Sequence, residues 1–505
     1  MKSRAILQIP RSAADVLHAL FKQGCIRDEW IWIDAICINQ ADVDEKNMQV
    51  ASMNEVYSLA KLTAAYVGPF TQSTDLAFRF WAKLDACLET AIAAGRGVLS
   101  GDELFMMTNT SPDSLEWRAL RAHFAQEWFT RTWVVQEVVL SQNLIFVWGH
   151  HSILWKQLKS MVTRERHFHY WGAIHESDFR ARQALAMISK FRKLKSNRKR
   201  HKGKGWKCGL SFALYETDDC KATDPRDRIF GLLGILHEPS MDFHIVPDYT
   251  ESVCDVYTEV TAKWTAAADS FDLTYAAGAG YSRSNPTLPS WVPDFVRSMP
   301  YYPGSFHRAG KAVNNVDLLP LTFKGNEMFV QVFRIDEIQS LVPFSYLQIN
   351  THPFLDAEQN QEIFQTLARS IELRKTIHDR PWPDDLYEHF CRTIVSNEQI
   401  HAIDAPAPDR FGVFCQNLSI FKQSNVRLTN CSISITTAAD GQSFFETPAA
   451  VSHDNAFCMT ASEKPGLIPG RSRVGDHVCV APGSRLPFVI RPEERREMER
   501  LSSGL

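Results

Sequence analysis

Trp133 and Glu137 lie four positions apart in the segment Arg131–Ser141, which its apolar pattern predicts to be a helix. At this spacing two side chains are neighbours on one helical face. A carboxylate beside an aromatic ring can stabilise an oxocarbenium-like sugar while the ring shapes the pocket, so this pair could serve a site that cleaves glycosidic bonds. The alternative is a structural role in which Glu137 pairs with Arg131 at the surface.

Asp34 and Asn39 are a second pair of polar residues at a place where chemistry is expected. Asp34 interrupts a near-continuous apolar run, Ile31–Ile38, which is typical of a strand covered on both faces, and Asn39 follows its end. In an open α/β sheet, ligands bind beyond the carboxyl ends of the strands, which would place Asn39 and its neighbours at a binding site. The alternative is that both side chains only satisfy backbone groups of the turn.

The elements that would position these residues follow one another with short connections. After the first strand, Asp42 and Glu45 have the spacing of a capping box at the start of a helix, and Thr63–Val67 and Leu144–Trp148 are predicted to be further strands. Strands and helices alternate, which favours right-handed crossovers and a parallel sheet. By contrast, Gly95–Pro112 has the composition of an irregular insertion. The predicted fold class of the N-terminal part is α/β.

The length of 505 residues and the composition are typical of a globular protein with two or three domains. With 45% hydrophobic residues, 22% charged residues and a formal net charge of −3, the composition favours neither nucleic acid nor membrane as a partner. The eleven cysteines lack the spacing of a zinc cluster or a disulfide framework. No run of about 18 apolar residues occurs, so we expect a cytoplasmic protein without a membrane span.

Basic residues dominate the segment 190–207, KFRKLKSNRKRHKGKGWK. Such a run could contact nucleic acid, as a nucleic-acid-linked regulator would, or direct entry into the nucleus. The alternative is a solvated linker between domains. The glycines near the end of the run favour the linker, as does the lack of an aromatic ladder or a nucleic-acid-binding module.

Other chemistry is not indicated by any motif. The sequence has no Walker loop, HExxH or GxSxG motif, and Gly278-Ala279-Gly280 lacks the third glycine of a dinucleotide-binding fingerprint. The pairs His150-His151 and His167/His169 have no acidic or cysteine companions at metal-ligand spacing. No metal site is therefore predicted.

The sequence changes character twice after the strand that ends at Trp148. A mainly helical region follows, in which Asp224-Pro225 has the residues of a helix start. The last part mixes strands with a helical segment, Phe354–Ile400. The predicted organisation is a domain of residues 1–156, a helical middle region of residues 157–300 with the basic linker 190–207, and a mixed C-terminal region of residues 301–505.

Two segments, WIDAICINQADVDEKNMQVASMNEVYSLA from Trp32 and WFTRTWVVQEVVLS from Trp128, resemble the fungal heterokaryon-incompatibility (HET) domain family. The later segments ATDPRDRIFGLLGIL, PDYTESVCDVY and LPSWVPDF resemble the downstream part of the same family, in the family's order. The resemblance implies a role in fungal nonself recognition, in which the domain triggers programmed cell death. Self-association or binding of a protein partner is the implied mode of action.

HET domains are in turn similar to TIR domains, which share a flavodoxin-like α/β sheet. Some TIR domains hydrolyse NAD at the nicotinamide–ribose bond with a glutamate in a W-x-x-x-E pattern, which Trp133 to Glu137 match. The resemblance implies an NAD glycohydrolase in which Glu137 is the catalytic carboxylate, and in which the substrate is bound by Trp133, Asp34 and Asn39. NAD would be the substrate, and no cofactor is expected.

The sequence also departs from the pattern of the HET family. Members usually begin with a strand motif of the type LSYxWG, which is absent here, so we expect a HET domain that is N-terminally incomplete and a sheet without its first strand. The His-Gly and Gly-Glu segment expected after PFVIRP is absent as well. A half-built pocket weighs against catalysis.

Overall fold

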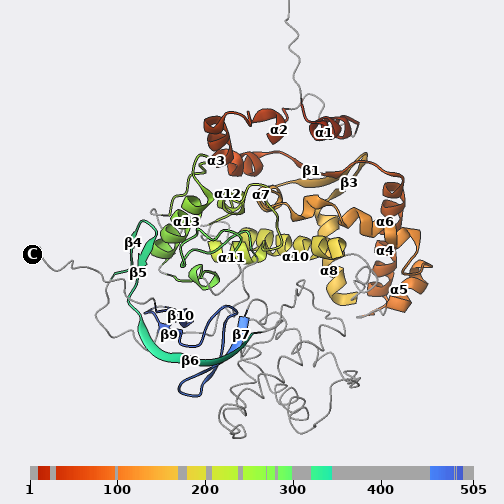
Figure 1. Ribbon diagram of the computed structural model, residues 1–505. Coiled ribbons are helices and arrows are strands. Elements are labelled where there is room, and N and C mark those ends of the chain that lie inside the picture. Colours follow the sequence, from red (N-terminus) through yellow and green to blue (C-terminus); the bar gives the residue numbers. More distant parts are fainter. Residues whose placement is uncertain are drawn as a thin grey trace, which may run out of the picture. The chain divides into compact units, whose positions relative to one another are not determined.

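Figure 1 shows the computed structural model of the chain. The residues that the structure describes are 9–22, 30–96, 101–168, 179–200, 208–236, 243–268, 270–278, 283–297, 320–343, 455–482, 484 and 486–492. The chain divides into two compact units: unit 1 is Met1–Val256 with Phe295–Ser298, and unit 2 is Tyr257–Asp294 with Met299–Leu505. The domain boundaries predicted at residues 156 and 300 stay predictions.

Within the described part of unit 1, the sheet has three strands in the order β1 (Thr63–Gly68), β2 (Leu144–Trp148) and β3 (His151–Leu154). Strands β1 and β2 are parallel, as the alternation of elements predicts, and Thr63 lies opposite Leu144. Strand β3 returns antiparallel to β2 after a tight turn. The prediction of an α/β fold is thereby confirmed.

Both faces of this sheet are covered by apolar side chains. Val147 of β2 packs against Ala19 and Leu20 of helix α1 (Arg11–Lys22) on one face. The neighbouring Phe146 points the other way and its ring lies 5.3 Å from that of Trp128, which belongs to the short 3-10 helix η1 (Glu127–Thr130). The alternation follows from the two-residue period of a strand.

Helix α3 (Val43–Leu59) begins where the sequence predicts. The side chain of Asp42 accepts a hydrogen bond of 3.0 Å from the backbone N–H of Glu45. The Glu45 carboxylate does not close the capping box on Asp42 but accepts a hydrogen bond of 3.0 Å from the backbone N–H of Asn39. The acidic residues thus fix the turn before the helix as well as the helix start.

The predicted strand Ile31–Ile38 is wrong. Residues Asp34–Cys37 form the single helical turn α2, with a 2.7 Å hydrogen bond from the Cys37 N–H to the Ile33 carbonyl. Among the described residues, no strand pairs with this run, and several of its side chains are half-buried rather than covered on both faces. An apolar run of this length does not by itself distinguish a buried strand from a helical turn.

A helical layer follows β1 in the chain. Helix α4 (Gln72–Ala93) packs against α6 (Leu115–Phe124), with the rings of Phe80 and Trp117 4.8 Å apart. The expectation of an irregular insertion over Gly95–Pro112 is wrong for its central part, where α5 (Gly101–Thr108) is helical. Thr108 and Thr110 satisfy polar groups at the end of that helix, and Trp117 Nε1 donates to the Thr110 hydroxyl at 3.0 Å.

The basic run is a packed helix and not a linker over its described part. Helix α10 (Phe179–Arg200) lies beside helix α7 (Val134–Leu140) and helix α11 (Leu210–Glu216), as Figure 1 shows. Lys190 Nζ lies 2.6 Å from Asp218 and 2.8 Å from Asp219. Burial opposes the charge of Lys190, but the two aspartates outweigh it and raise its pKa.

Two further cations of the run bind backbone carbonyls at the end of α7. Lys195 is 5% exposed, and its Nζ donates to the carbonyls of Val138, at 2.6 Å, and Ser141. Arg198 donates to the Val139 carbonyl at 3.2 Å. Cations at a helix C-terminus neutralise its carbonyl dipoles, so these residues have a structural role. Residues 201–207 of the run lie outside the described residues.

Two further helices of unit 1 are α8 (Trp155–Phe168), which follows β3, and α12 (Asp227–Leu233). The predicted helix start at Asp224-Pro225 is two residues early, since α12 begins at Asp227 with Arg226 as its N-cap, and the Asp224 side chain instead fixes the preceding turn by accepting from the Arg226 N–H at 3.0 Å. Arg228 is buried and donates to the carbonyls of Thr217, at 2.8 Å, and Phe295, at 2.9 Å. These bonds explain why a guanidinium is stable inside the protein.

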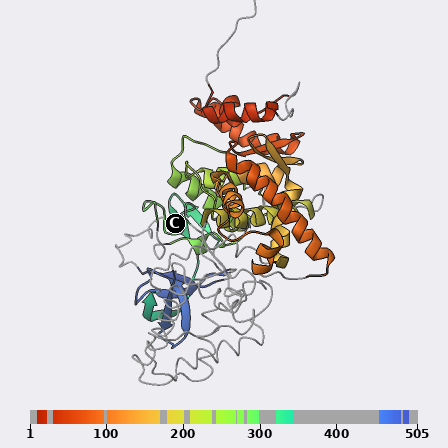
Figure 2. The same ribbon diagram turned by 90° about the vertical axis from the view of Figure 1, so that its right-hand side faces the viewer.

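Unit 2 contains an antiparallel sheet in the strand order β10-β9-β6-β7-β8, drawn in teal and blue in Figure 2. Its buried cluster includes Ile338, Ala456 and Cys458. The predicted helices of Phe354–Ile400 lie outside the described residues. The elements that belong wholly or mainly to this unit are α13 (Val253–Ala268), η2 (Thr274–Ala276), β4 (Thr322–Lys324), β5 (Glu327–Phe329), β6 (Phe333–Pro343), β7 (Asn455–Thr460), β8 (Pro465–Pro469), β9 (His477–Val480) and β10 (Phe488–Ile490).

Candidate functional site

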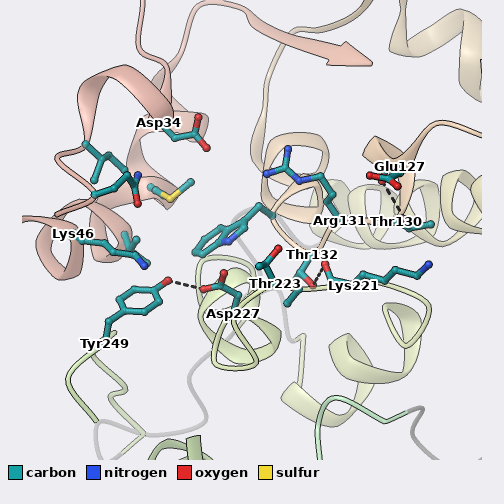
Figure 3. Close-up of a pocket in the computed structure, with 16 residues that line it drawn as sticks. Asp34, Lys46, Glu127, Thr130, Arg131, Thr132, Lys221, Thr223, Asp227 and Tyr249 are labelled. Atoms are coloured by element: carbon teal, nitrogen blue, oxygen red, sulfur yellow. Dashed lines mark hydrogen bonds between the residues drawn. The ribbon is translucent and has the colours of Figure 1, made fainter. Parts of the chain in front are cut away.

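Two cavities in unit 1 contain three of the four predicted site residues. The Glu137 cavity, named after that residue in its wall, has a volume of about 570 Å³. The Trp133 cavity, which Trp133 lines, has a volume of about 430 Å³. Asp34 and Arg131 line both cavities, and Figure 3 shows their side chains extending toward each other from opposite sides.

Glu137 is an acidic residue in the wall of the first cavity whose pKa is shifted. Desolvation by the surrounding side chains raises its pKa to about 7, and the negative charge of Asp34 adds to the rise. Arg131 and a hydrogen bond from the indole of Trp128 act in the opposite direction. A carboxyl group that titrates near neutrality can exchange protons or carry charge at physiological pH, which is the property that general acids and bases need.

Aromatic rings form much of the remaining wall of the Glu137 cavity. The rings of Trp32 and Tyr57 meet edge to face at 6.2 Å. Burial raises the pKa of Tyr57 well above its usual value, and the charges of Glu137 and Asp34 raise it further. Tyr57 is therefore a neutral hydroxyl beside the carboxyl group. Sequence reasoning missed Tyr57 and Trp128, because their positions on α3 and η1 give no signal that they meet Glu137.

Helix α7 holds Glu137 in place through contacts at its two ends. Gln136 is buried and its Nε2 donates to the Gly231 carbonyl of α12 at 3.1 Å. At the other end, the Ser141 hydroxyl donates to Thr63 Oγ1 at 2.6 Å, and Lys195 binds the last carbonyls. A short helix gains most of its stability from such tertiary contacts, so the position of Glu137 depends on them.

The acidic residue Asp227 lines the Trp133 cavity and accepts two side-chain hydrogen bonds. Asp227 accepts a 2.5 Å hydrogen bond from the Tyr249 hydroxyl, drawn as a dashed line in Figure 3, and another from the Trp133 side chain. Lys46 Nζ lies 3.6 Å from the centre of the Tyr249 ring. Burial raises the pKa of Asp227, while both hydrogen bonds lower it.

The structure thus separates the two residues of the W-x-x-x-E pattern. Trp133 is the N-cap of α7 and precedes the helix, which begins at Val134. Trp133 lines one cavity and Glu137 lines the other. Trp133 nevertheless has helical dihedral angles, with φ −62° and ψ −28°, and its carbonyl accepts from the Glu137 N–H at 3.4 Å, so their different cavities are not explained by the start of the helix.

Asn39 lines neither of these cavities. It is exposed, and its side-chain oxygen accepts a hydrogen bond of 3.2 Å from the backbone N–H of Ala41. This contact matches the alternative role expected for Asn39, which is to satisfy the turn. Its contribution to substrate binding stays a prediction.

Helices that could cross a bilayer are not found among the described residues, since none combines the necessary length with enough apolar side chains. The cysteines that the structure describes are all free thiols. Burial raises the pKa of Cys220 to about 12, so this thiol is a buried apolar group and not a nucleophile.

Comparisons with known proteins find two similarities. Residues 2–137 match a family model described as Heterokaryon incompatibility protein (HET). A curated relative is Heterokaryon incompatibility protein 6, OR allele, of Neurospora crassa, which is 24% identical over 315 residues, covering 52% of this chain and 44% of the relative. The chain therefore spans less than half the length of this relative. No solved structure matches the chain.

Proposed function

We propose that this chain, whose residues 2–137 match the model of the heterokaryon-incompatibility (HET) family, takes part in nonself recognition and triggers programmed cell death through a HET domain. The family match is the observation that supports the proposal, and the name of the Neurospora crassa relative agrees with it. The matched segment contains Asp34, Arg131, Trp133 and Glu137, so these lining residues of both cavities belong to the domain. We place the protein in the cytoplasm and expect it to act by self-association or with a protein partner.

Inducible expression of the full chain in a filamentous fungus tests this proposal. We expect growth arrest and loss of viability after induction. Val135→Asp is the control, because Val135 is fully buried in α7 and a charge there should unfold the domain. Unchanged viability at a verified level of folded wild-type protein, or equal toxicity of the Val135→Asp variant, would contradict the proposal.

A second candidate function, NAD glycohydrolase, is favoured by Glu137. Its carboxyl group has a pKa raised to about 7 and lines a cavity whose volume of about 570 Å³ lies in the usual range for ligand sites. In the proposed reaction the bond between ribose C1′ and the nicotinamide nitrogen breaks, and nicotinamide leaves with the bonding electrons. Water then adds to C1′ and loses one proton, which gives ADP-ribose.

The charges around the Glu137 cavity suit such a substrate. The ionised Glu137 would stabilise the positive charge that develops on the ribose, and Asp34 adds negative potential. Arg131 and Lys61 line the same cavity and could bind the diphosphate. The indole rings of Trp32 and Trp128 offer apolar faces to the cationic nicotinamide ring.

Release of nicotinamide from NAD by the full-length protein, alone and after artificial clustering, tests the second candidate. We expect Glu137→Gln to lower the rate by about 100-fold or more. The matched control is Glu127→Gln, because Glu127 is exposed and lines only the Trp133 cavity. The wild-type rate should rise with pH through about 7 as Glu137 ionises. No release in either state, or full activity of Glu137→Gln, would refute the assignment.

A further inference from the structure

Three side chains of unit 1 that could bind a metal ion converge outside the two cavities. Asp75 Oδ1 lies 2.5 Å from His151 Nε2 and 3.8 Å from His150 Nε2. A set of ligand atoms from the three residues lies within 4.8 Å of one another. The sequence predicts no metal site here because the acidic partner is 76 positions away from His151, on helix α4.

The two imidazole rings are held in place by an aromatic stack. The ring of Phe70 lies 4.4 Å from that of His150, which lies 4.4 Å from His151, and His151 lies 4.5 Å from Phe78. The four rings therefore form a continuous series that limits the rotation of both histidines. Limiting the rotation of ligands before an ion binds reduces the entropic cost of binding.

The backbone on both sides of the cluster is also fixed. Asp75 lies in the first turn of α4, where Thr71 and Thr74 form a reciprocal capping box. Gly149, which precedes the histidines, has a φ of +56°, and its N–H donates to the Gly68 carbonyl at 3.0 Å. A Cβ at this glycine would lie 2.3 Å from Phe70 Cβ. The β2–β3 turn therefore holds the histidines against Phe70 and the start of α4.

We propose that Asp75, His150 and His151 bind a divalent transition-metal ion of the zinc class. Two imidazole nitrogens and one carboxylate oxygen form a ligand set that suits Zn²⁺ and its neighbours in the first transition row, and does not suit Ca²⁺ or Mg²⁺, which prefer oxygen alone. Zn–N and Zn–O bonds of about 2.0–2.2 Å place tetrahedral ligand atoms roughly 3.3 Å apart. The two observed nitrogen–oxygen distances, 2.5 Å and 3.8 Å, lie on either side of that value.

The site is open to solvent on one side. The side chains of His150 and Asp75 are 51% and 46% exposed, whereas that of His151 is 26% exposed. An ion can therefore enter without unfolding of the domain. Three protein ligands leave the fourth tetrahedral position for water or for a group from another molecule. The bound ion would link the start of α4 to the β2–β3 turn.

Titration of the metal-free, full-length protein with Zn²⁺ against a chromogenic chelator tests the proposal. We expect one equivalent to bind, the melting temperature to rise with Zn²⁺, and Asp75→Asn or His150→Ala to weaken binding at least about tenfold. Co²⁺ in place of Zn²⁺ should give the visible absorption of a four-coordinate site, and His150→Ala should abolish it. Asp75→Asn keeps the size of the side chain, so circular dichroism should show a folded protein.

Two control variants separate this site from other ligands of the protein. His18→Ala removes an exposed histidine of α1, and Cys37→Ser removes an exposed thiol that could bind zinc by itself. Both should bind Zn²⁺ like the wild type. Binding that survives Asp75→Asn and His150→Ala, binding that disappears in Cys37→Ser, or no stoichiometric binding at all would overturn the proposal.

Discussion

The Glu137 cavity and the Trp133 cavity share Asp34 and Arg131, yet they treat their acidic groups differently. In the Trp133 cavity, Asp227 receives hydrogen bonds from Tyr249 and Trp133, which offset part of the cost of burial. In the Glu137 cavity, desolvation outweighs the single indole hydrogen bond and the charge of Arg131, and the pKa of Glu137 rises to about 7.

This difference bears on which of the two acids is the better candidate for chemistry. A buried acid with two donors is typical of a structural contact, since its polar atoms are satisfied. A desolvated carboxyl group that titrates near neutrality costs stability when it ionises, and such groups concentrate at functional sites. The comparison therefore favours Glu137 over Asp227 as the functional acid, although Trp133 belongs to the other cavity.

The largest effect on stability is expected from Glu137→Gln. The pKa of Glu137 is about 7 in the folded protein, whereas an unperturbed glutamate has a pKa of 4.5. The folded state therefore binds more protons between these values, and the wild type loses stability as pH rises through them. The shift corresponds to about 3 kcal/mol above pH 7. Glu137→Gln should therefore be more stable than the wild type at about pH 8 and similar at about pH 4.5.

Denaturant unfolding of the wild type and of Glu137→Gln across this pH range measures the difference in their unfolding free energies. Subtracting one curve from the other removes the contribution of all other titrating groups, provided that they are unchanged by the substitution. Parallel curves for the two proteins would show that burial does not perturb Glu137.

A second effect, of about 2 kcal/mol, is expected from Lys195→Met. The substitution keeps the apolar stem but removes the ammonium group that donates to the Val138 and Ser141 carbonyls. Because α7 contains Glu137 and begins directly after Trp133, both cavities should be perturbed together. Lys156→Met, at an exposed position of α8, is the control and should be neutral. Equal unfolding free energies of the two variants would contradict this role of Lys195.

Tyr249→Phe tests the Trp133 cavity alone and should cost about 1–2 kcal/mol. It removes the hydroxyl that donates to Asp227, so the pKa of Asp227 should rise further. The pH dependence that Glu137 causes should stay as in the wild type. If Tyr249→Phe also shifted the titration of Glu137, the two cavities could not be treated as separate. Tyr66→Phe is the matched control, because it also removes a tyrosine hydroxyl but lies in the wall of the Glu137 cavity and not of the Trp133 cavity.

The smallest effect, about 0.5–1 kcal/mol, is expected from Asn39→Ala, which removes the side-chain acceptor for the Ala41 N–H. Asn39→Asp keeps this acceptor and should be nearly neutral. Kinetics of nicotinamide release decide between the two roles of Asn39. A turn role predicts an unchanged KM in both variants, whereas a raised KM in a folded Asn39→Ala protein would support substrate binding.

Local patterns in the sequence predict several elements of this fold correctly. Strands β1 and β2 follow from short apolar runs with clear ends, and the cap of α3 follows from Asp42 and its spacing to Glu45. Such signals act over a few residues, so a sequence is enough to detect them. The prediction for the run Ile31–Ile38 is wrong because strand and helical turn differ there only in pairing, which is a long-range property.

Prediction of the site residues is limited in the same way, because it depends on contacts between residues far apart in the sequence. Glu137 could be selected as a candidate from its motif, but the motif does not show that Trp133 and Glu137 line different cavities. The structural role of Lys195 is hidden inside a basic run that resembles a linker. Asp75 and His151 are brought together only by the packing of α4 against the β2–β3 turn. No local pattern encodes such contacts.

Direct titration of the Glu137 carboxyl group tests the central claim. Isotope-edited infrared difference spectra of glutamate-labelled wild type and Glu137→Gln, recorded from about pH 4 to 9, isolate the signal of this one group. Desolvation of this half-buried side chain predicts a carboxyl band that disappears with a midpoint near pH 7. A midpoint near 4.5, the value of an exposed glutamate, would contradict the claim that this cavity contains the functional acid.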